Sequence, residues 1–131
     1  MAATLDVEIV ADTADPAVMA ELERAAVAAA QAMNVSDGHL AVALVGSDEI
    51  HLLNREHRGV DRPTDVLSFP VDGTEPAAGP RELGDVVICP EHTLDLEEAT
   101  VHGVLHLCGH DHERDAGEML ALQERVIASL R

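Results

Sequence analysis

The spacing of hydrophobic and polar residues along the chain predicts strands and helices in turn. Residues 5–10, LDVEIV, alternate between apolar and acidic side chains, which is typical of a strand with one buried face. The Ala-rich stretch from Pro16 to about Met33 is expected to form a helix, because Asp15 supplies a capping side chain and the proline ring presets the first helical φ. Further apolar, β-rich runs predict strands over residues 39–45 (HLAVALV), 65–69 (DVLSF) and 84–90 (GDVVICP).

Capping residues predict where the remaining helices begin. Asp95 with Glu98 three residues later resembles a capping box, in which the aspartate side chain accepts a hydrogen bond from a backbone N–H of the first turn. Gly109 fits the left-handed residue that ends such a helix. The predicted caps are Ser47 for a short helix to about residue 57, Asp95 for a helix to about Cys108, and Asp115 with Glu118 for a helix to about Leu130.

The order of these elements, βαβαββαα, indicates a single α+β domain that spans residues 1–131. No internal repeat or linker divides the sequence, and the length suits one domain. Residues 72–82, DGTEPAAGPRE, combine glycine, proline and acidic side chains, so they are expected to form an exposed loop.

Composition limits both the core and the partners. Apolar residues make up 47% of the chain, which excludes a disordered tail, yet there is no Trp, no Tyr and a single Phe, Phe69. Ala, Val, Leu and Ile are therefore expected to fill the interior, with Cys89 and Cys108 as buried free thiols. The formal net charge is −17 and all eight basic residues are arginine, so the surface repels polyanions and binding to DNA is not expected.

The N-terminal segment MAATLDVEIV lacks a basic residue and carries Asp6 and Glu8, unlike a signal peptide. No apolar run approaches the ~20 residues needed to cross a bilayer. We therefore expect a cytoplasmic protein with no membrane association.

Half of the histidines lie in the segment HGVLHLCGHDH, residues 102–112. His102 and His106 are four residues apart, so on a helix they share one face. Such a pair can bind one metal ion, and His112 can join it after the chain turns at Gly109. Three imidazoles leave a fourth position open, as in catalytic zinc sites, so we predict one Zn²⁺ held by these three residues. The other histidines, His39, His51, His57 and His92, are expected to have surface or packing roles, with His110 at the rim of the site.

The spacing H-x3-H-x2-G-x2-H matches the zinc-binding helix of metzincin proteases, so we expect a metzincin-like helix here. In those proteases the residue after the first histidine is a glutamate that acts as the general base. Gly103 occupies that position in this chain, and a zinc peptidase is therefore disfavoured.

A cluster of arginines marks the one segment that locally favours an anion. Arg55, Arg58 and Arg62 lie within residues 54–70, and the planar guanidinium fork suits phosphate oxygens. Composition alone favours a different interpretation, in which these arginines pair with Glu56 and Asp61 on the surface.

The motifs taken together resemble those of the YbeY family. The resemblance covers about residues 35–128, with RGVDRPTDVLSFP over 58–70, LGDVVIC over 83–89, HGVLHLCGHDHE over 102–113 and M-x3-Q over 119–123. It implies an α+β fold with a mixed four-stranded sheet packed with about four to five helices. It also implies a single-strand-specific metallo-endoribonuclease that acts in 16S rRNA 3′-end maturation and ribosome quality control by zinc-assisted phosphodiester cleavage.

Residue by residue, the resemblance implies that His102, His106 and His112 are the zinc ligands and that Arg58 is the active-site arginine. The implied partners are single-stranded rRNA and the small ribosomal subunit or its proteins. Asp85 and Asp111 are both candidates for a general base, and neither is assigned. The acidic surface and the short segment between Cys89 and His102 keep one alternative open, an inactive ribosome-associated module that binds zinc for stability.

Overall fold

The structure, a computed structural model, describes residues 5–11, 15–35, 37–71, 82–109 and 117–131. Its strands are β1 (Leu5–Val10), β2 (Gly38–Leu44), β3 (Val66–Pro70) and β4 (Glu82–Ile88). They form one four-stranded sheet in the order β1-β2-β4-β3. The first three strands of that order run parallel and β3 is antiparallel to β4, so the mixed sheet is confirmed.

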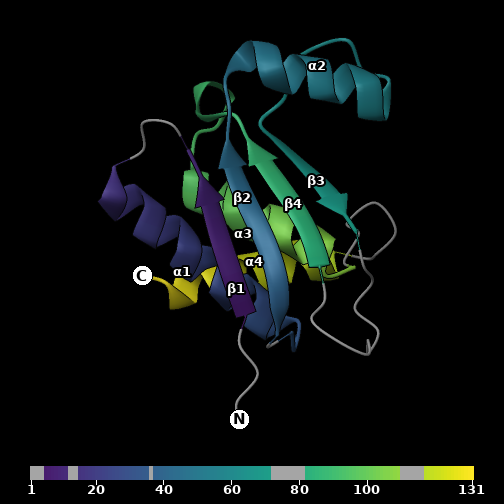
Figure 1. Ribbon diagram of the computed structural model, residues 1–131. Helices are drawn as coiled ribbons and strands as arrows, with labels where there is room; N and C mark the ends of the chain where they lie inside the picture. Colours follow the sequence, from purple (N-terminus) through teal and green to yellow (C-terminus); the bar gives the residue numbers. More distant parts are fainter. Residues whose placement is uncertain (1–4, 12–14, 36, 72–81, 110–116) are drawn as a thin grey trace.

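The helices of the described residues are α1 (Pro16–Ala32), α2 (Ser47–Arg58), α3 (Leu96–Leu107) and α4 (Glu118–Ser129), with a 3-10 turn η1 (Pro90–His92) before α3. Figure 1 shows α1, α3 and α4 behind the sheet and α2 across its upper end. Helix α3 lies in the middle of this layer, in contact with α1, α4, β3 and β4. Because α3 is held from several sides, the direction in which its side chains point is fixed.

Small side chains fill the main core, as the composition predicted. Ala25, Ala26, Ala29 and Ala30 of α1 are fully buried, and this allows α1 to approach α3 closely. The valines, leucines and isoleucines of β2, β4 and α3 complete the cluster. Both cysteines are buried, as expected.

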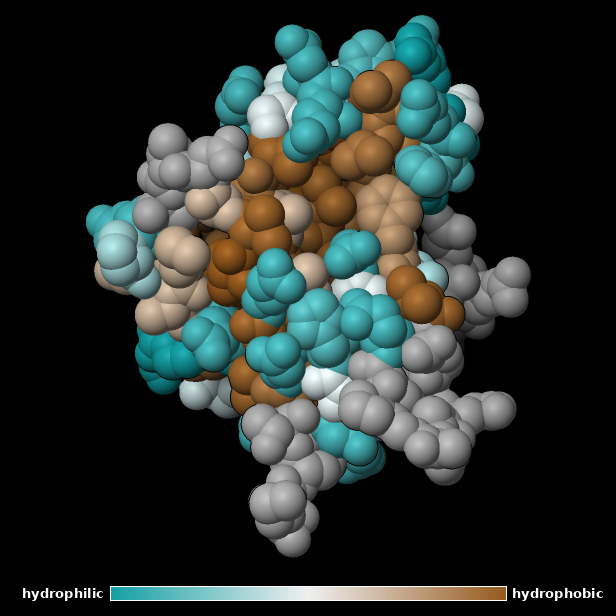
Figure 2. Space-filling view, in the orientation of Figure 1, coloured by the Kyte–Doolittle hydropathy of each residue, from teal (hydrophilic) through white to brown (hydrophobic). Residues whose placement is uncertain are grey.

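The opposite face of the sheet is only partly covered. Ile50 of α2 packs there with Leu67, Val87 and Cys89 in a second, smaller cluster. In Figure 2 this face shows apolar side chains below α2 and hydrophilic ones over the lower part of the sheet. The ring of His39, near the start of β2, contacts carboxylates on both neighbouring strands.

Local capping signals were partly right. Asp15 accepts a hydrogen bond from the backbone N–H of Ala17 at 2.8 Å and begins α1 as predicted. Asp95 accepts one from the backbone N–H of Glu98 at 3.1 Å, so the start of α3 is confirmed. Gly109 has φ +95°, the left-handed conformation expected after this helix.

Two predicted helix starts are wrong. Gly46 is the N-cap of α2, and Ser47 is already helical, so the Ser47 hydroxyl instead lies 2.8 Å from the Nε2 of His92. Gly117 is the N-cap of α4, which begins at Glu118, later than the predicted start at Asp115. In both helices a glycine takes the capping position without a side-chain hydrogen bond.

The predicted 72–82 loop overlaps strand β4 by one residue. Glu82 belongs to β4 rather than to the loop, and residues 72–81 lie outside the described residues. In the part of the chain that is described, no helix has the length and hydrophobicity to cross a membrane.

Candidate metal and phosphate site

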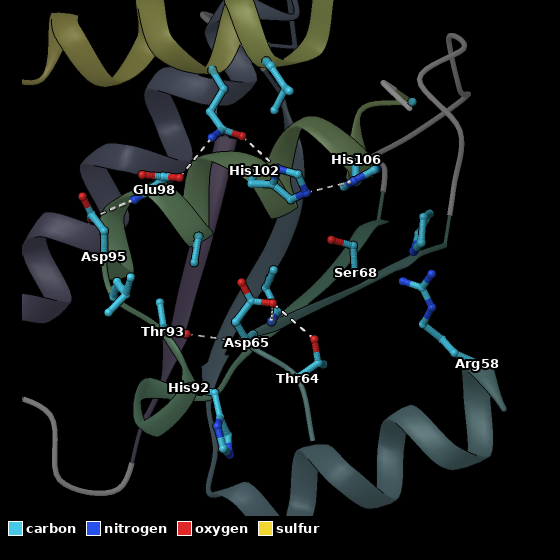
Figure 3. Close-up of a pocket in the computed structure, with 17 residues that line it drawn as sticks. Arg58, Thr64, Asp65, Ser68, His92, Thr93, Asp95, Glu98, His102 and His106 are labelled. Atoms are coloured by element: carbon cyan, nitrogen blue, oxygen red, sulfur yellow. Dashed lines mark hydrogen bonds between the residues drawn. The ribbon is translucent and has the colours of Figure 1, made fainter. Parts of the chain in front are cut away.

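A pocket of about 860 Å³ brings together His102 and His106 of the histidine motif and Arg58 of the arginine segment. It is lined by α3, β3, α4, the segment after η1 and the last residue of α2 (Figure 3). The side chains that line it include Arg58, Asp65, Ser68, His92, Asp95, Glu98, His102, His106 and Gln123.

Helix α3 places His102 and His106 one turn apart on the face that borders the pocket. Its other faces are buried by residues such as Val101, Val104 and Leu105, so the helix cannot rotate without exposing them. The Nε2 atoms of the two histidines lie 3.2 Å apart, and their ring centroids are 4.8 Å apart. The two imidazoles therefore converge on one point at their Nε2 atoms.

This spacing suits two ligands of one metal ion. Two nitrogen ligands at ~2.0–2.1 Å from a tetrahedral ion lie about 3.3 Å from each other, close to the 3.2 Å between the two Nε2 atoms. His112, the predicted third ligand, lies outside the described residues, as do His110 and Asp111. Among the residues that are described, no group of three His, Cys, Asp or Glu side chains is arranged to hold a metal.

Gln123 of α4 contacts the His102 ring at its Nδ1 atom. Its Oε1 lies 2.8 Å from the Nδ1 of His102, and its Nε2 lies 3.5 Å from the Oε1 of Glu98. Gln123 is 7% exposed, so this amide is removed from bulk water. The sequence motif contained Gln123, but its contact with His102 depends on how α4 packs against α3.

Arg58 is the last residue of α2 and lines the same pocket. The helix ends there because Gly59 adopts φ +70°, a left-handed conformation that residues with a Cβ atom rarely adopt. In Figure 3 the guanidinium of Arg58 extends from the end of α2 toward the side of the pocket that holds Ser68 and His106. Arg58 therefore lines the same pocket as His102 and His106, whereas Arg55 and Arg62 are not among its lining residues.

Carboxylates line the rest of the pocket and were not predicted as part of it. The Asp65 carboxylate accepts hydrogen bonds from the backbone N–H of Val66 at 2.8 Å and the hydroxyl of Thr64 at 3.2 Å, which fixes its position opposite His102 (Figure 3). The backbone N–H of Glu98, and to a smaller extent Arg131, lowers the pKa of Asp95 below its usual range. Asp85, considered as a general base, is not a pocket-lining residue, and it alternates with Val86, which faces the main core.

His92 also lines the pocket, although the sequence suggested only a surface or packing role. Its Nε2 contacts the hydroxyl of Ser47, which connects η1 to the start of α2.

Gly103 faces away from the pocket and against the sheet. A Cβ at this position would overlap the Cγ1 of Val86 and lie 3.3 Å from the hydroxyl of Ser68. The glutamate that proteases of similar spacing carry after the first histidine therefore has no room here.

These features define a small α+β protein in which one pocket combines a convergent histidine pair with an arginine. The sequence profile described as "Endoribonuclease YbeY" matches residues 6–131. The chain therefore belongs to the YbeY endoribonuclease family, whose members are named as enzymes that cleave RNA.

Individual relatives agree with this assignment. An Endoribonuclease YbeY of Chloroflexus aggregans is 42% identical over 97% of this chain and 97% of its own length. One from Rubrobacter xylanophilus is 48% identical over 72% of this chain and 69% of its own length. The solution structure of a Thermotoga maritima protein superposes with a TM-score of 0.61 at 29% identity, and covers 95% of this chain and 88% of that one.

Proposed function

We propose that this protein is a single-strand-specific metallo-endoribonuclease that acts in 16S rRNA 3′-end maturation and ribosome quality control. His102, His106 and His112 hold one Zn²⁺, and Arg58 binds the scissile phosphate. The observation that carries the proposal is the 3.2 Å separation of the His102 and His106 Nε2 atoms in a pocket that also contains Arg58.

The charge of the pocket supports a bound dication. Its described lining contains one guanidinium, Arg58, and three carboxylates, Asp65, Asp95 and Glu98, so with neutral histidines the balance is one positive against three negative charges. A pocket of this charge repels a phosphodiester. A divalent ion on the histidines offsets that excess and makes phosphate binding favourable.

Each group then has a distinct task. When bound, zinc supplies Lewis-acid polarisation and lowers the pKa of water. The guanidinium of Arg58 donates to the non-bridging oxygens, where negative charge develops in the transition state. Gln123 holds His102 in place by its hydrogen bond to Nδ1. Whether RNA is cut by water or through its own 2′-hydroxyl does not alter these assignments.

The acidic surface favours a protein partner for docking. With a formal net charge of −17, the chain repels RNA at a distance, so rRNA alone would bind it weakly. A basic protein of the small ribosomal subunit would supply the attraction and bring the pocket to a single-stranded segment. The proposed site of action is the cytoplasm, where rRNA is processed.

The main experiment pairs metal analysis with RNA cleavage. We expect purified protein to contain one zinc per chain and to cut a single-stranded 16S rRNA 3′-end fragment, but not the same fragment annealed into a duplex. Chelation should abolish cleavage and added zinc should restore it. His106→Ala should lose both zinc and activity. His51 is a partly exposed histidine of α2 that pairs with Asp61, and His51→Ala should keep both.

The same samples test the two alternatives. An inactive ribosome-associated module would retain zinc and leave the single-stranded fragment intact. A peptidase would cut a denatured protein substrate in a zinc-dependent manner, which the exclusion of a side chain at Gly103 makes unexpected. Full zinc occupancy in His106→Ala would contradict the ligand assignment.

A further inference from the structure

We propose that Gln123, oriented by Glu98, is a positioning residue that selects the ring tautomer of His102 in which Nε2 carries the lone pair. This inference rests on the proposed zinc site and deepens it, since it concerns how the chain prepares one ligand before the ion arrives. It does not concern a step of the reaction itself.

The amide of Gln123 forms a hydrogen bond with the ring of His102. The Oε1 of Gln123 lies 2.8 Å from the Nδ1 of His102 (Figure 3). An amide oxygen can only accept, so the Nδ1 atom must carry the hydrogen. A neutral imidazole with hydrogen on Nδ1 has its lone pair on Nε2, the atom that faces His106.

The contact with Glu98 determines the orientation of the Gln123 amide. The Nε2 of Gln123 lies 3.5 Å from the Oε1 of Glu98, and an ionised carboxylate offers only acceptors. A rotated amide would point its oxygen at this carboxylate and its NH₂ at His102, which is unfavourable at the Glu98 end. Glu98 is itself placed by the Asp95 cap, since its backbone N–H donates to the Asp95 carboxylate at 3.1 Å.

Gln123 is a polar side chain that the fold buries. The other buried polar side chains of the described residues, Asn54 and Thr100, donate to backbone carbonyl oxygens and so serve the fold. The two hydrogen bonds of Gln123 both go to side chains, and one of these is a proposed ligand. Burying an amide costs free energy unless it is paired, so this residue is placed for its contact with His102.

The consequence is a pre-formed ligand. A metal-binding histidine needs an unprotonated nitrogen directed at the ion, and a partner on the other nitrogen fixes both the tautomer and the ring orientation. The 3.2 Å contact between the Nε2 atoms of His102 and His106 fits this tautomer, with His102 Nε2 as the acceptor. The selection is therefore present before zinc binds.

Ring ¹⁵N–¹H correlation spectra of the zinc-free protein test this directly. In the wild type we expect the His102 ring to be protonated at Nδ1 alone. Gln123→Leu, which has a similar volume and no acceptor, should populate both tautomers. Gln31→Leu, the same change at an exposed position of α1, should leave the His102 signals unchanged. Thermal unfolding of each zinc-free variant checks that the fold is retained.

Zinc affinity, measured by competition with a chromophoric chelator, provides a second readout. Gln123→Leu should weaken zinc binding by about 10- to 100-fold, the range seen when partners of metal-binding histidines are removed. Glu98→Gln should weaken it less, because a neutral amide no longer forces the orientation of Gln123. In the double variant Glu98→Gln, Gln123→Glu, the carboxylate at position 123 accepts the hydrogen bond from His102. The amide at position 98 avoids placing two carboxylates side by side. The zinc affinity of this variant should therefore return to within about threefold of the wild-type value.

The outcomes separate this inference from the proposed function. Protonation of His102 at Nε2 in the wild type would overturn the inference, whatever the metal does. It would also be overturned if Gln123→Leu kept wild-type zinc affinity while His106→Ala lost it, or if the double variant bound zinc no better than Gln123→Leu. If the wild type bound no zinc, the proposed function would fail, and the ring spectra would still decide whether Gln123 selects the tautomer.

Discussion

The hydroxyl of Ser68 on β3 donates a hydrogen bond to the carbonyl oxygen of Gly103 on α3 at 3.1 Å. This contact is made one residue after His102, in a stretch where α3 lies directly on the sheet. Helix α3 can approach the sheet this closely because Gly103 has no Cβ atom. The side chain of Val86 on β4 occupies the space that a Cβ atom at position 103 would need. Ser68 and Gly103 together therefore set how far the histidine face of α3 stands from β3.

Gly103→Ala should destabilise the protein. Alanine improves helix propensity by ~1 kcal/mol, but forcing a methyl group against the stiff side chain of Val86 costs about 1–3 kcal/mol. We expect a net loss of up to about 2 kcal/mol in the free energy of unfolding, measured by urea denaturation of the zinc-free protein.

A double-mutant cycle provides the control. In a Val86→Ala background the added methyl group has room, so Gly103→Ala should cost less there than in the wild type. An equal cost in both backgrounds would mean that Val86 does not limit the approach of α3.

Arg58→Ala should separate phosphate binding from metal binding. Zinc content should stay at the wild-type level, because Arg58 belongs to α2 and the proposed ligands to α3 and the segment after it. Cleavage of single-stranded RNA should fall by ~10²- to 10³-fold, as expected when one donor to a developing negative charge is removed.

The matched variant is Arg55→Ala, which removes an exposed arginine one turn earlier on α2 and outside the described pocket lining. It should retain near wild-type cleavage and zinc content. Loss of zinc in Arg58→Ala would instead assign this arginine a structural role.

Local relationships in this chain could be predicted from sequence, because helix geometry alone determines them. The Asp95 to Glu98 cap spans three residues and the His102 to His106 pair spans four, so each needs only that a helix forms. The mixed sheet came from the family resemblance rather than from periodicity, since alternation does not reveal which strands pair.

The relationships that failed or were missed depend on tertiary packing. Ser47 and Asp115 carry good capping side chains, yet glycines at positions 46 and 117 occupy the N-caps. The contact of Gln123 with His102 bridges two helices that are separated in sequence, and no local pattern encodes how those helices dock. The third ligand, His112, lies outside the described residues and stays a prediction.

Asp95→Ala should loosen the start of α3. Loss of an N-cap carboxylate costs typically about 1 kcal/mol, whereas its exposed contact with Arg131 adds little. The folded-state pKa of Asp95 is lowered, mainly by the Glu98 N–H, so its contribution is present above the unfolded-state value and is lost as pH falls through the folded-state value.

Urea denaturation of the wild type and the variant across acidic pH measures this contribution. The stability difference should be full near neutral pH and shrink below about pH 4. Asp95→Asn retains a capping oxygen and should cost less than Asp95→Ala at neutral pH. If both variants lost the same free energy of unfolding, the stabilisation would come from the ion pair between Asp95 and Arg131 and not from the helix cap.

His39 should make a pH-dependent contribution of opposite sign. Its Nδ1 lies 2.7 Å from a Glu82 oxygen and its Nε2 lies 3.3 Å from a Glu8 oxygen, so the ring bridges β1 and β4. The Glu82 hydrogen bond is the largest cause that raises the pKa of His39, and burial opposes it. The stabilisation by charged His39 is therefore full below the unfolded-state pKa of ~6.5 and is lost as pH rises through the folded-state pKa.

A double-mutant cycle with His39→Gln and Glu82→Gln isolates this pair from the general repulsion of an acidic surface. The coupling free energy from urea denaturation should be largest near about pH 6 and should decline toward about pH 9, where the ring is neutral. High salt should reduce it, because the pair is partly exposed. A coupling free energy that does not change with pH would mean that the ring bonds to Glu82 as a neutral donor and carries no charge in the folded state.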